Sequence, residues 1–258
     1  FQKSALMRKL YGWGWSRKIL HRVAGKQLKK LFGGRMRLFA IGGAKFDSAA
    51  ERFLLEAGFP YGIGYGLTET APLLAGAVGN MVRVGSTGPA LPAVKVRLDN
   101  INPDTQQGEI VVQTPSCMVG YYKNEEATKA AFTEDGWFRT GDLGAMAEDG
   151  WIFIKGRLKN MIVGPSGENI YPEDIEEVLN SNRFVAESVV TEEDGKLIAL
   201  VHFDTTELEE AYDEFKHKVA VSAEQLQLKM EEIKREVMEY VNSKVNRFSK
   251  ISKVVDNE

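Results

Sequence analysis

Residues 36–58 read Met36-Arg-Leu-Phe-Ala-Ile-Gly-Gly-Ala-Lys-Phe-Asp-Ser-Ala-Ala-Glu-Arg-Phe-Leu-Leu-Glu-Ala-Gly58. The partial alternation of apolar side chains over 36–41 predicts a short strand, which ends at the small residues Gly42–Ala44. Asp47 then has the position of a helix N-cap, and Gly58 has that of the residue that closes the helix. A strand, a glycine loop and a helix in this order are typical of an α/β unit.

Two different patterns flank this unit. Upstream, apolar residues recur at helical spacing from about 16 to 32. From about 82 to 154, short β-rich runs are separated by Gly, Pro and Asp, which is typical of a small antiparallel sheet or barrel. These runs are Val94–Leu98, Glu109–Gln113 and Trp151–Ile154.

After Arg157 the pattern changes again. It predicts a helix over 172–180, strands over 185–191 and 196–203, and then two charged helices. The second charged helix has an apolar stripe, which is either a coiled-coil seam or, as we favour, a face packed on its own domain. The stripe comprises Leu226, Met230, Ile233, Val237 and Val241.

Together these patterns predict an α/β fold with a β-rich subdomain, followed by a small α+β C-terminal domain. We expect the first domain to span 1–158, with the α/β unit to about 80 and the β-rich part over about 82–158. The second domain is expected over 159–258. A chain of 258 residues with 43% hydrophobic residues is long enough to bury a core in each.

Cysteine and histidine usage excludes two kinds of site. The single cysteine, Cys117, excludes an intrachain disulfide and fits a reducing compartment, so we expect a cytoplasmic protein. The three histidines are scattered and no zinc-ligand spacing occurs, so a dedicated transition-metal site is not expected.

Charge is distributed unevenly along the chain. The first 37 residues carry eleven Lys and Arg and no acidic residue, whereas the rest holds 22 basic and all 36 acidic residues. The basic, tryptophan-containing stretch Tyr11-Gly-Trp-Gly-Trp15-Ser-Arg-Lys18 is suited to peripheral contact with an anionic membrane or a phosphorylated ligand, and a solvated helical face is the other interpretation. The net charge of −3 argues against nucleic acid as a partner.

The first motif with chemical potential is Tyr61-Gly-Ile-Gly-Tyr-Gly-Leu-Thr-Glu-Thr70. Its glycines let the backbone approach a ligand closely, and Tyr65 offers a flat face for stacking. Thr68 supplies a hydroxyl group, and Glu69 supplies a hard oxygen ligand that suits Mg²⁺. On the residues alone, a turn with an incidental acid explains the motif equally well.

Three further motifs follow it. In Gly136-Trp-Phe-Arg-Thr-Gly-Asp142, a carboxylate in a tight turn can bind a ribose diol or cap its own turn. In Lys155-Gly-Arg-Leu-Lys-Asn160, Arg157 offers a fixed fork of donors for hydroxyl or phosphate oxygens, or forms a surface ion pair. The last motif, Gly164-Pro-Ser-Gly-Glu-Asn-Ile-Tyr-Pro172, is either a ligand-binding loop or a simple connection.

The order of these motifs resembles that of the adenylate-forming superfamily, which includes acyl-CoA synthetases, luciferases and the adenylation domains of peptide synthetases. The resemblance rests on the series Gly-Gly-Ala, Tyr-Gly-x-Thr-Glu, Thr-Gly-Asp, Gly-Arg-x-Lys and Ser-Gly-Glu-Asn-Ile-Tyr-Pro-Glu. It extends over nearly the whole chain and is clearest from Gly33 to Glu177. It implies the adenylate-forming fold, truncated at its N-terminus.

The resemblance implies a nucleotide site. Gly42, Gly43 and Ala44 match the loop beside the adenine ring, and Tyr65 matches the aromatic residue that stacks on adenine. Asp142 matches the carboxylate that binds the ribose. The other implied nucleotide-binding positions are Gly64, Gly66, Leu67 and, flanking the ribose, Ile154 and Arg157.

Catalytic, metal and hinge positions are implied in the same way. Thr68 matches the hydroxyl that contacts the α-phosphate, and Glu69 matches the acid linked to Mg²⁺. Lys159 matches the hinge about which the C-terminal domain pivots between an adenylating and a thioester-forming arrangement. Ser166 and Gly167 match the stretch that lines the pantetheine channel of CoA.

This sequence also departs from the family pattern. Asn169 stands where some relatives have a phosphate-binding arginine. No stretch matches the family's phosphate loop, and Lys250 and Lys253 are poor candidates for its catalytic lysine. Because the chain also begins with Phe1 rather than Met, we expect a fragment that lacks both motifs and makes no product alone.

The implied reaction joins a carboxylic acid to CoA at the expense of ATP, through an acyl-adenylate, with ATP or AMP, Mg²⁺ and CoA as ligands. The region from Gly33 to Pro72 looks most like that of long-chain fatty acyl enzymes, and Gly62 and Gly64 are expected to leave space beside Tyr65 for an acyl tunnel. A ligase that loads a carrier protein and a catalytically silent nucleotide-binding relative are the alternatives.

Overall fold

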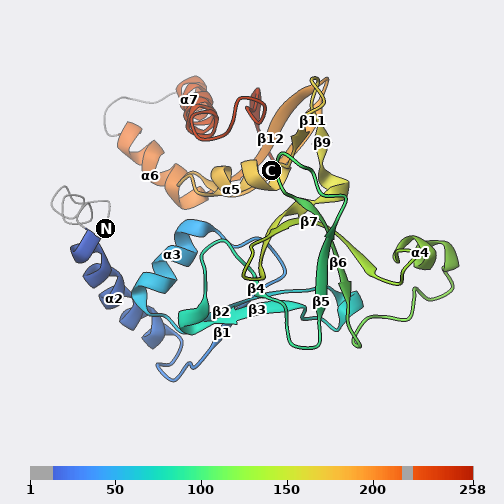
Figure 1. Ribbon diagram of the computed structural model, residues 1–258. Coiled ribbons are helices and arrows are strands. Elements are labelled where there is room, and N and C mark those ends of the chain that lie inside the picture. The colour runs from blue at the N-terminus through green and yellow to red at the C-terminus, as the bar shows by residue number, and fades with distance from the viewer. Residues whose placement is uncertain (1–13, 217–222, 258) are drawn as a thin grey trace. The chain divides into compact units, whose positions relative to one another are not determined.

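The computed structural model describes residues 14–216 and 223–257. The chain divides into two compact units, Phe1–Ile154 and Lys155–Glu258, and Figure 1 shows the elements of each. The boundary expected from the sequence, after residue 158, lies slightly further along the chain. The mixed α/β content and the separate sheets confirm the expected fold class.

The first sheet of the first unit has the order β1-β2-β3. Strand β1 (Phe39–Ile41) runs parallel to β2 (Tyr61–Tyr65), and β3 (Ala75–Val78) runs antiparallel to β2. The first strand is shorter than the sequence predicted. Its pairing begins where the Phe39 N–H donates to the Pro60 carbonyl over 2.7 Å, and Pro60 has no N–H with which to extend the ladder.

Two helices accompany this sheet. Helix α3 (Ser48–Ala57) has the predicted caps, since Asp47 accepts from the Ala50 N–H over 2.6 Å and Gly58 has φ 64°. Helix α2 (Gly14–Leu31) packs on α3 at Gly25, where a Cβ atom would lie only 2.8 Å from that of Ala57. The absent side chain at this position therefore allows the two helices to pack closely.

The second sheet of this unit has five strands in the order β4-β8-β7-β6-β5. Ala75 of β3 and the preceding residue Leu74 share a buried cluster with Ile110, Phe138 and Ile152 from the second sheet, so one core joins both sheets. The strands are β4 (Gly88–Pro89), β5 (Lys95–Asp99), β6 (Gly108–Gln113), β7 (Phe138–Met146) and β8 (Trp151–Arg157). The short elements of the unit are η1 (Thr68–Thr70), η2 (Gly79–Met81) and α4 (Glu125–Ala130).

The second unit is an α+β structure with a sheet in the order β11-β12-β13. Ile233, Val237 and Val241 of its last helix are buried in the core of the unit, which excludes the coiled-coil interpretation of that stripe; the side chain of Leu226 lies outside the described residues. Its elements are η3 (Leu158–Asn160), β9 (Ile162–Val163), β10 (Asn169–Ile170), α5 (Pro172–Asn180), β11 (Val185–Glu193), β12 (Lys196–Phe203), α6 (Thr205–Lys216), α7 (Ala223–Asn242) and β13 (Lys253–Asp256).

Over the ranges 14–216 and 223–257, none of the helices combines the length and the apolar character that crossing a membrane requires.

A buried carboxyl group ties α3 to its neighbours in the first unit. Glu51 is only 2% exposed, and its Oε2 atom accepts from the Gly85 N–H over 2.8 Å. The Tyr61 hydroxyl lies 3.5 Å from Glu51 Oε1. Burial raises the pKa of Glu51 above its ordinary value of 4.5, because the apolar surroundings disfavour its charged form.

This raised pKa predicts how Glu51 affects stability. As the pH rises above 4.5, the unfolded state releases the Glu51 proton first, so the contribution of this group to stability falls until the pH passes the folded-state pKa. Glu51→Gln keeps an acceptor for Gly85 and should remove this pH dependence without loss of stability near pH 7. Glu51→Ala should cost about 1–3 kcal/mol because the Gly85 N–H loses its partner. Urea unfolding at about pH 5 and about pH 7.5 measures both effects, and an unchanged pH dependence in Glu51→Gln would contradict the assignment.

Candidate functional site

Two loops lie together at one edge of the first sheet. Because β1 and β2 are parallel, their carboxyl ends meet there, where ligands commonly bind in α/β proteins. The exposed Gly42–Ala44 loop follows β1, and the segment from Tyr65 onward ends β2. A Cβ atom on Gly42 would lie 2.9 Å from the Gly64 carbonyl oxygen, and Gly43 has φ 88°, so both glycines are required by this arrangement.

A hydrogen bond joins the first and second motifs. The Tyr65 hydroxyl donates to Asp142 Oδ2 over 2.6 Å, across 77 positions of sequence. Asp142 is only 4% exposed. Tyr65, Leu67 and Ile154 pack against the same apolar cluster, so the structure brings these predicted residues together in the first unit.

Asp142 lies on a bulge of β7 and not in the tight turn expected from the sequence. Val111 pairs with Arg139 and Glu109 pairs with Leu143, so residues 140–142 all lie opposite one residue of β6. Gly141 supplies the φ of 69° that the irregular backbone needs. A bulge was hidden from sequence analysis because it depends on how β7 aligns with β6.

The η1 turn presents Thr68 and Glu69. Thr70 is fully buried, and its Oγ1 atom donates to the Leu67 carbonyl over 3.0 Å and accepts from the Leu67 N–H over 3.2 Å. This side chain, which the sequence analysis did not select, holds the turn closed. Thr68 is exposed and Glu69 is half-buried, so both can meet a ligand.

The segment of residues 116–121 lies across this turn. The Met118 N–H donates to the Glu69 carbonyl over 2.7 Å, and the Ser116 hydroxyl donates to the Thr70 carbonyl over 2.9 Å. The Tyr121 hydroxyl donates to Glu69 Oε1 over 3.0 Å. Burial and then the hydrogen bond to the Glu69 carboxylate raise the pKa of Tyr121, which keeps it a donor at neutral pH.

The glycines of the first motif serve chain packing. A Cβ atom on Gly66 would lie 1.6 Å from the Pro72 carbonyl oxygen, so the close approach that the sequence suggested for a ligand is made by the chain itself. The space that Gly62 and Gly64 were expected to leave for an acyl tunnel is filled. Their Cβ atoms would meet side chains of Val78, Leu38 and Leu73 at 2.7–3.2 Å.

The donor set in the first unit fits Mg²⁺ better than a caged metal. Among the described residues, no group of three or more His, Cys, Asp or Glu side chains is placed to hold a metal. Mg²⁺ is commonly bound through one or two carboxylates, with substrate phosphates and water completing its shell. Glu69, with one carboxylate oxygen held by Tyr121, offers one such ligand.

The second unit carries the remaining predicted residues. Glu173 Oε1 accepts from the Arg157 N–H over 3.3 Å and from Asn160 Nδ2 over 2.9 Å, so the exposed Lys159 lies between two residues tied to α5. Ser166 and Gly167 form the exposed connection of the β9–β10 hairpin, beside Asn169 of β10. Lys253 begins β13.

Tyr121, Ser116 and Thr70 are the residues that sequence analysis missed. Ser116 and Tyr121 reach the turn from 46 and 52 positions away, and neither lies in a motif with recognisable chemistry. Thr70 was part of the quoted first motif, and only its burial shows its role. Cys117 lies beside them, and burial raises the pKa of its thiol, which disfavours a nucleophilic thiolate.

Comparison with known proteins places these motifs in context. A family model described as AMP-binding enzyme matches residues 8–122. The long-chain-fatty-acid–CoA ligase FadD15 of Mycobacterium bovis is 34% identical over 206 residues, which is 80% of this chain and 32% of that protein. A chloroplastic long-chain-fatty-acid–acyl-carrier-protein ligase of Arabidopsis thaliana is 32% identical over 213 residues, covering 73% of this chain and 29% of that protein.

The chain also resembles solved structures of CoA synthetases. The o-succinylbenzoate CoA synthetase of Bacillus subtilis in complex with ATP and magnesium ion has a TM-score of 0.68 at 26% identity, covering 86% of this chain and 42% of that one. Its complex with the acyl-adenylate intermediate has the same TM-score at 27% identity. The chain spans about a third of the length of the curated relatives described above.

Proposed function

We propose that this chain, which belongs to the adenylate-forming superfamily of AMP-binding enzymes, holds the adenosine part of ATP at the carboxyl ends of β1 and β2. The observation that carries the proposal is the 2.6 Å hydrogen bond from Tyr65 to Asp142. It fixes an aromatic face for adenine next to a carboxylate that can accept from ribose hydroxyls. The Gly42–Ala44 loop, which approaches the Gly64 carbonyl, is proposed to border the base.

The phosphates would lie toward the η1 turn. Thr68 presents its hydroxyl for the α-phosphate, and Glu69 presents a carboxylate oxygen for Mg²⁺. When bound there, Mg²⁺ supplies positive charge that offsets the negative charge of the phosphates. Arg157, with its fork of donors, is proposed for the ribose and phosphate oxygens.

We further propose an acid–thiol ligase reaction for the protein to which these residues belong. The carboxylate of the acid attacks the α-phosphorus of ATP, and pyrophosphate leaves to give an acyl-adenylate. The thiol of CoA then attacks the acyl carbonyl, and AMP leaves. Ser166 and Gly167 are proposed to border the pantetheine arm of CoA.

A fatty acid is the proposed acyl substrate, because FadD15 is named as a long-chain-fatty-acid–CoA ligase. The Arabidopsis relative, named as an acyl-carrier-protein ligase, supports the alternative of a carrier acceptor. Release of AMP from palmitoyl-adenylate that requires CoA, and not carrier protein, would decide between the two.

Thr68, Glu69, Asp142 and Arg157 are all present, which counts against a silent relative. Within these 258 residues no stretch matches the phosphate loop or the catalytic-lysine motif, so we propose that the chain alone forms no acyl-CoA.

The nucleotide site predicts the effect of Asp142→Asn. The amide keeps an acceptor for Tyr65 but loses the negative charge that attracts the ribose hydroxyls, so ATP binding to this chain should weaken by about 1–3 kcal/mol. Isothermal titration calorimetry measures this affinity. Asp149→Asn is the control, because Asp149 is exposed and pairs with Arg83 on the surface. If Asp142→Asn and Asp149→Asn bind ATP with equal affinity, the proposed role of Asp142 in nucleotide binding is wrong.

We propose that the connection around Lys159 is the hinge between the two units. Lys159 is exposed and lies in the short η3 turn, near the start of the second unit. Glu173 holds Arg157 and Asn160 on either side of it, so a rotation there exchanges a few hydrogen bonds and does not disturb a core.

The hinge predicts that Lys159→Pro restricts the motion of the second unit. Proline fixes φ near −65° and disfavours the helical conformation of Leu158 before it. With one spectroscopic label in each unit, we expect wild type to show ATP-dependent separations and Lys159→Pro to show one separation. Lys159→Ala, which leaves φ free, should behave as wild type. Similar distributions in the proline variant and wild type would contradict the hinge.

We also propose peripheral contact between α2 and an anionic membrane. Its outward side combines apolar and basic residues: Trp15, Ile19 and Val23 are 65%, 51% and 54% exposed, and Lys18, Arg22, Lys26 and Lys30 are exposed too. The helix holds no acidic residue. Such a face can insert its apolar side chains between headgroups while its cations pair with lipid phosphates.

This face predicts salt-sensitive binding to vesicles. Vesicles with phosphatidylserine should sediment the protein at low salt, and added salt should release it by screening the attraction. Trp15→Ser should reduce sedimentation. Leu228→Ser is the control, because Leu228 is 66% exposed on α7, which lies in the other unit. Equal sedimentation with neutral and anionic vesicles would leave α2 as a solvated face.

A further inference from the structure

The half-buried Glu69 has a specific hydrogen-bond donor that lies far away in sequence. The Tyr121 hydroxyl reaches Glu69 Oε1 over 3.0 Å and leaves Oε2 to other partners. We propose that Tyr121 is a positioning residue, which holds the Glu69 carboxylate in the orientation that binds the cation of a Mg²⁺–nucleotide ligand. The inference rests on the proposed function and deepens it.

Tyr121 is itself held in place by its surroundings. Its N–H donates to Thr128 Oγ1 over 2.9 Å, and the Thr128 hydroxyl donates to the Asn124 carbonyl over 2.7 Å. Asn124 in turn caps α4, accepting from the Ala127 N–H over 3.0 Å. A Cβ atom on Gly120 would lie 2.7 Å from Thr128 Cγ2, so the chain packs closely against the helix at this point. The phenol therefore approaches Glu69 from a backbone that is fixed independently.

The phenol hydroxyl adds little to the attachment of the 116–121 segment. That segment is already fastened to the η1 turn by the Met118 N–H on the Glu69 carbonyl and by the Ser116 hydroxyl on the Thr70 carbonyl. Both contacts use backbone atoms of the turn. Removal of the Tyr121 hydroxyl therefore leaves the turn attached and frees only the carboxylate.

A held carboxylate binds a cation better than a free one. A glutamate side chain loses rotamer freedom when it coordinates an ion, and that loss opposes binding. The hydrogen bond from Tyr121 restricts Glu69 before the ligand arrives, and a donor to a carboxylate forms one of the stronger hydrogen bonds in proteins. The effect should therefore appear only in the part of nucleotide binding that depends on Mg²⁺.

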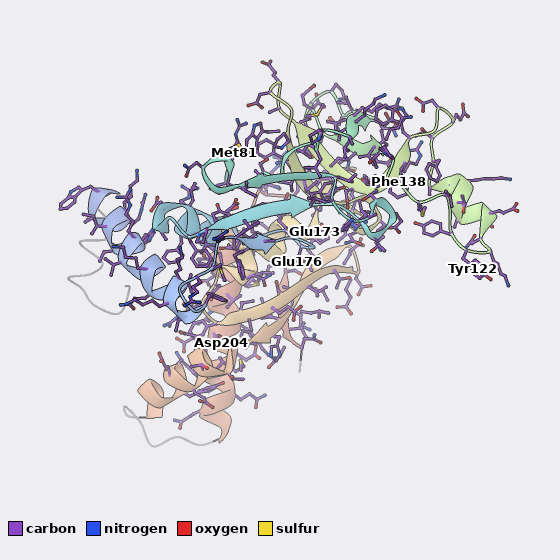
Figure 2. The ribbon with its side chains drawn as sticks, turned by 90° about the horizontal axis from the view of Figure 1, so that it is seen from below. Met81, Tyr122, Phe138, Glu173, Glu176 and Asp204 are labelled. Atoms are coloured by element: carbon purple, nitrogen blue, oxygen red, sulfur yellow. The ribbon has the colours of Figure 1, made fainter. Side chains whose placement is uncertain are left out.

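The neighbouring tyrosine provides a matched control. Tyr122, labelled in Figure 2, is 87% exposed, and its ring contacts the Lys123 ammonium group at 5.2 Å. Tyr122→Phe removes the same phenol oxygen from the adjacent residue and leaves the hydrogen bond to Glu69 in place. Tyr121→Phe and Tyr122→Phe should show similar thermal unfolding.

The test compares ATP affinity in Mg²⁺ and in EDTA, by calorimetry, for wild type and the two variants. We expect Tyr121→Phe to weaken binding about tenfold in Mg²⁺ and to leave binding in EDTA unchanged. Tyr122→Phe should bind as wild type in both. In a Glu69→Gln background, Tyr121→Phe should not weaken ATP binding further. Tyr121 is proposed to act only through the Glu69 carboxylate, so the effects of the two substitutions should not add.

The possible failures can be distinguished. Mg²⁺ is expected to increase the affinity for ATP. If Glu69→Gln abolishes this increase while Tyr121→Phe retains it in full, the inference is overturned and the proposed function stands. Equal weakening by Tyr121→Phe in Mg²⁺ and in EDTA would show a purely structural role and would also overturn the inference. If wild type gains no affinity from Mg²⁺, the proposed role of Glu69 and this inference fail together.

Discussion

The hydrogen bond between the Tyr65 hydroxyl and Asp142 Oδ2 joins the two sheets of the first unit at their shared core. A carboxylate that is only 4% exposed needs partners, because burial of an unpaired charge is costly. Tyr65 provides one, and its ring is thereby fixed at the carboxyl end of β2. The parallel pairing of β1 with β2 then places the Gly42–Ala44 loop beside Gly64, the residue that precedes Tyr65. The proposed adenosine site depends on this one contact and on the strand order around it.

Close backbone packing sets the shape of the same region. Gly66 approaches the Pro72 carbonyl so closely that a side chain cannot be accommodated, and Thr70 closes the η1 turn from inside. Gly141 allows the bulge that turns Asp142 into the core. Residues that resemble a flexible glycine loop in sequence are thus tightly constrained. This rigidity suits a site that must keep an aromatic face, a hydroxyl and a carboxylate at fixed positions before a ligand binds.

Polar contacts over long sequence distances complete the site and the proposed hinge. Tyr121 reaches Glu69 across 52 positions, and Glu173 reaches Asn160 across 13. The first contact orients a carboxylate, whereas the second ties the η3 turn to α5. Their effects differ, because Glu69 belongs to the proposed ligand site, whereas Glu173 holds the connection near the start of the second unit. In both contacts, the hydrogen-bond donor determines what the carboxylate does: Tyr121 orients Glu69, and Asn160 engages Glu173.

Local patterns in the sequence determined much of this protein. Asp47 and Gly58 cap α3 because capping depends on adjacent backbone groups, and the apolar stripe ending at Val241 marks the buried face of α7. The sequence motifs also indicated Tyr65, Glu69 and Asp142 as candidates. Only the tertiary structure decided that Asp142 lies on a bulge, that neighbouring side chains fill the space beside Gly62 and Gly64, and that Tyr121 contacts Glu69. Strand alignment, side-chain volume and distant hydrogen bonds are set by how segments meet in space, and no short stretch of sequence contains that information.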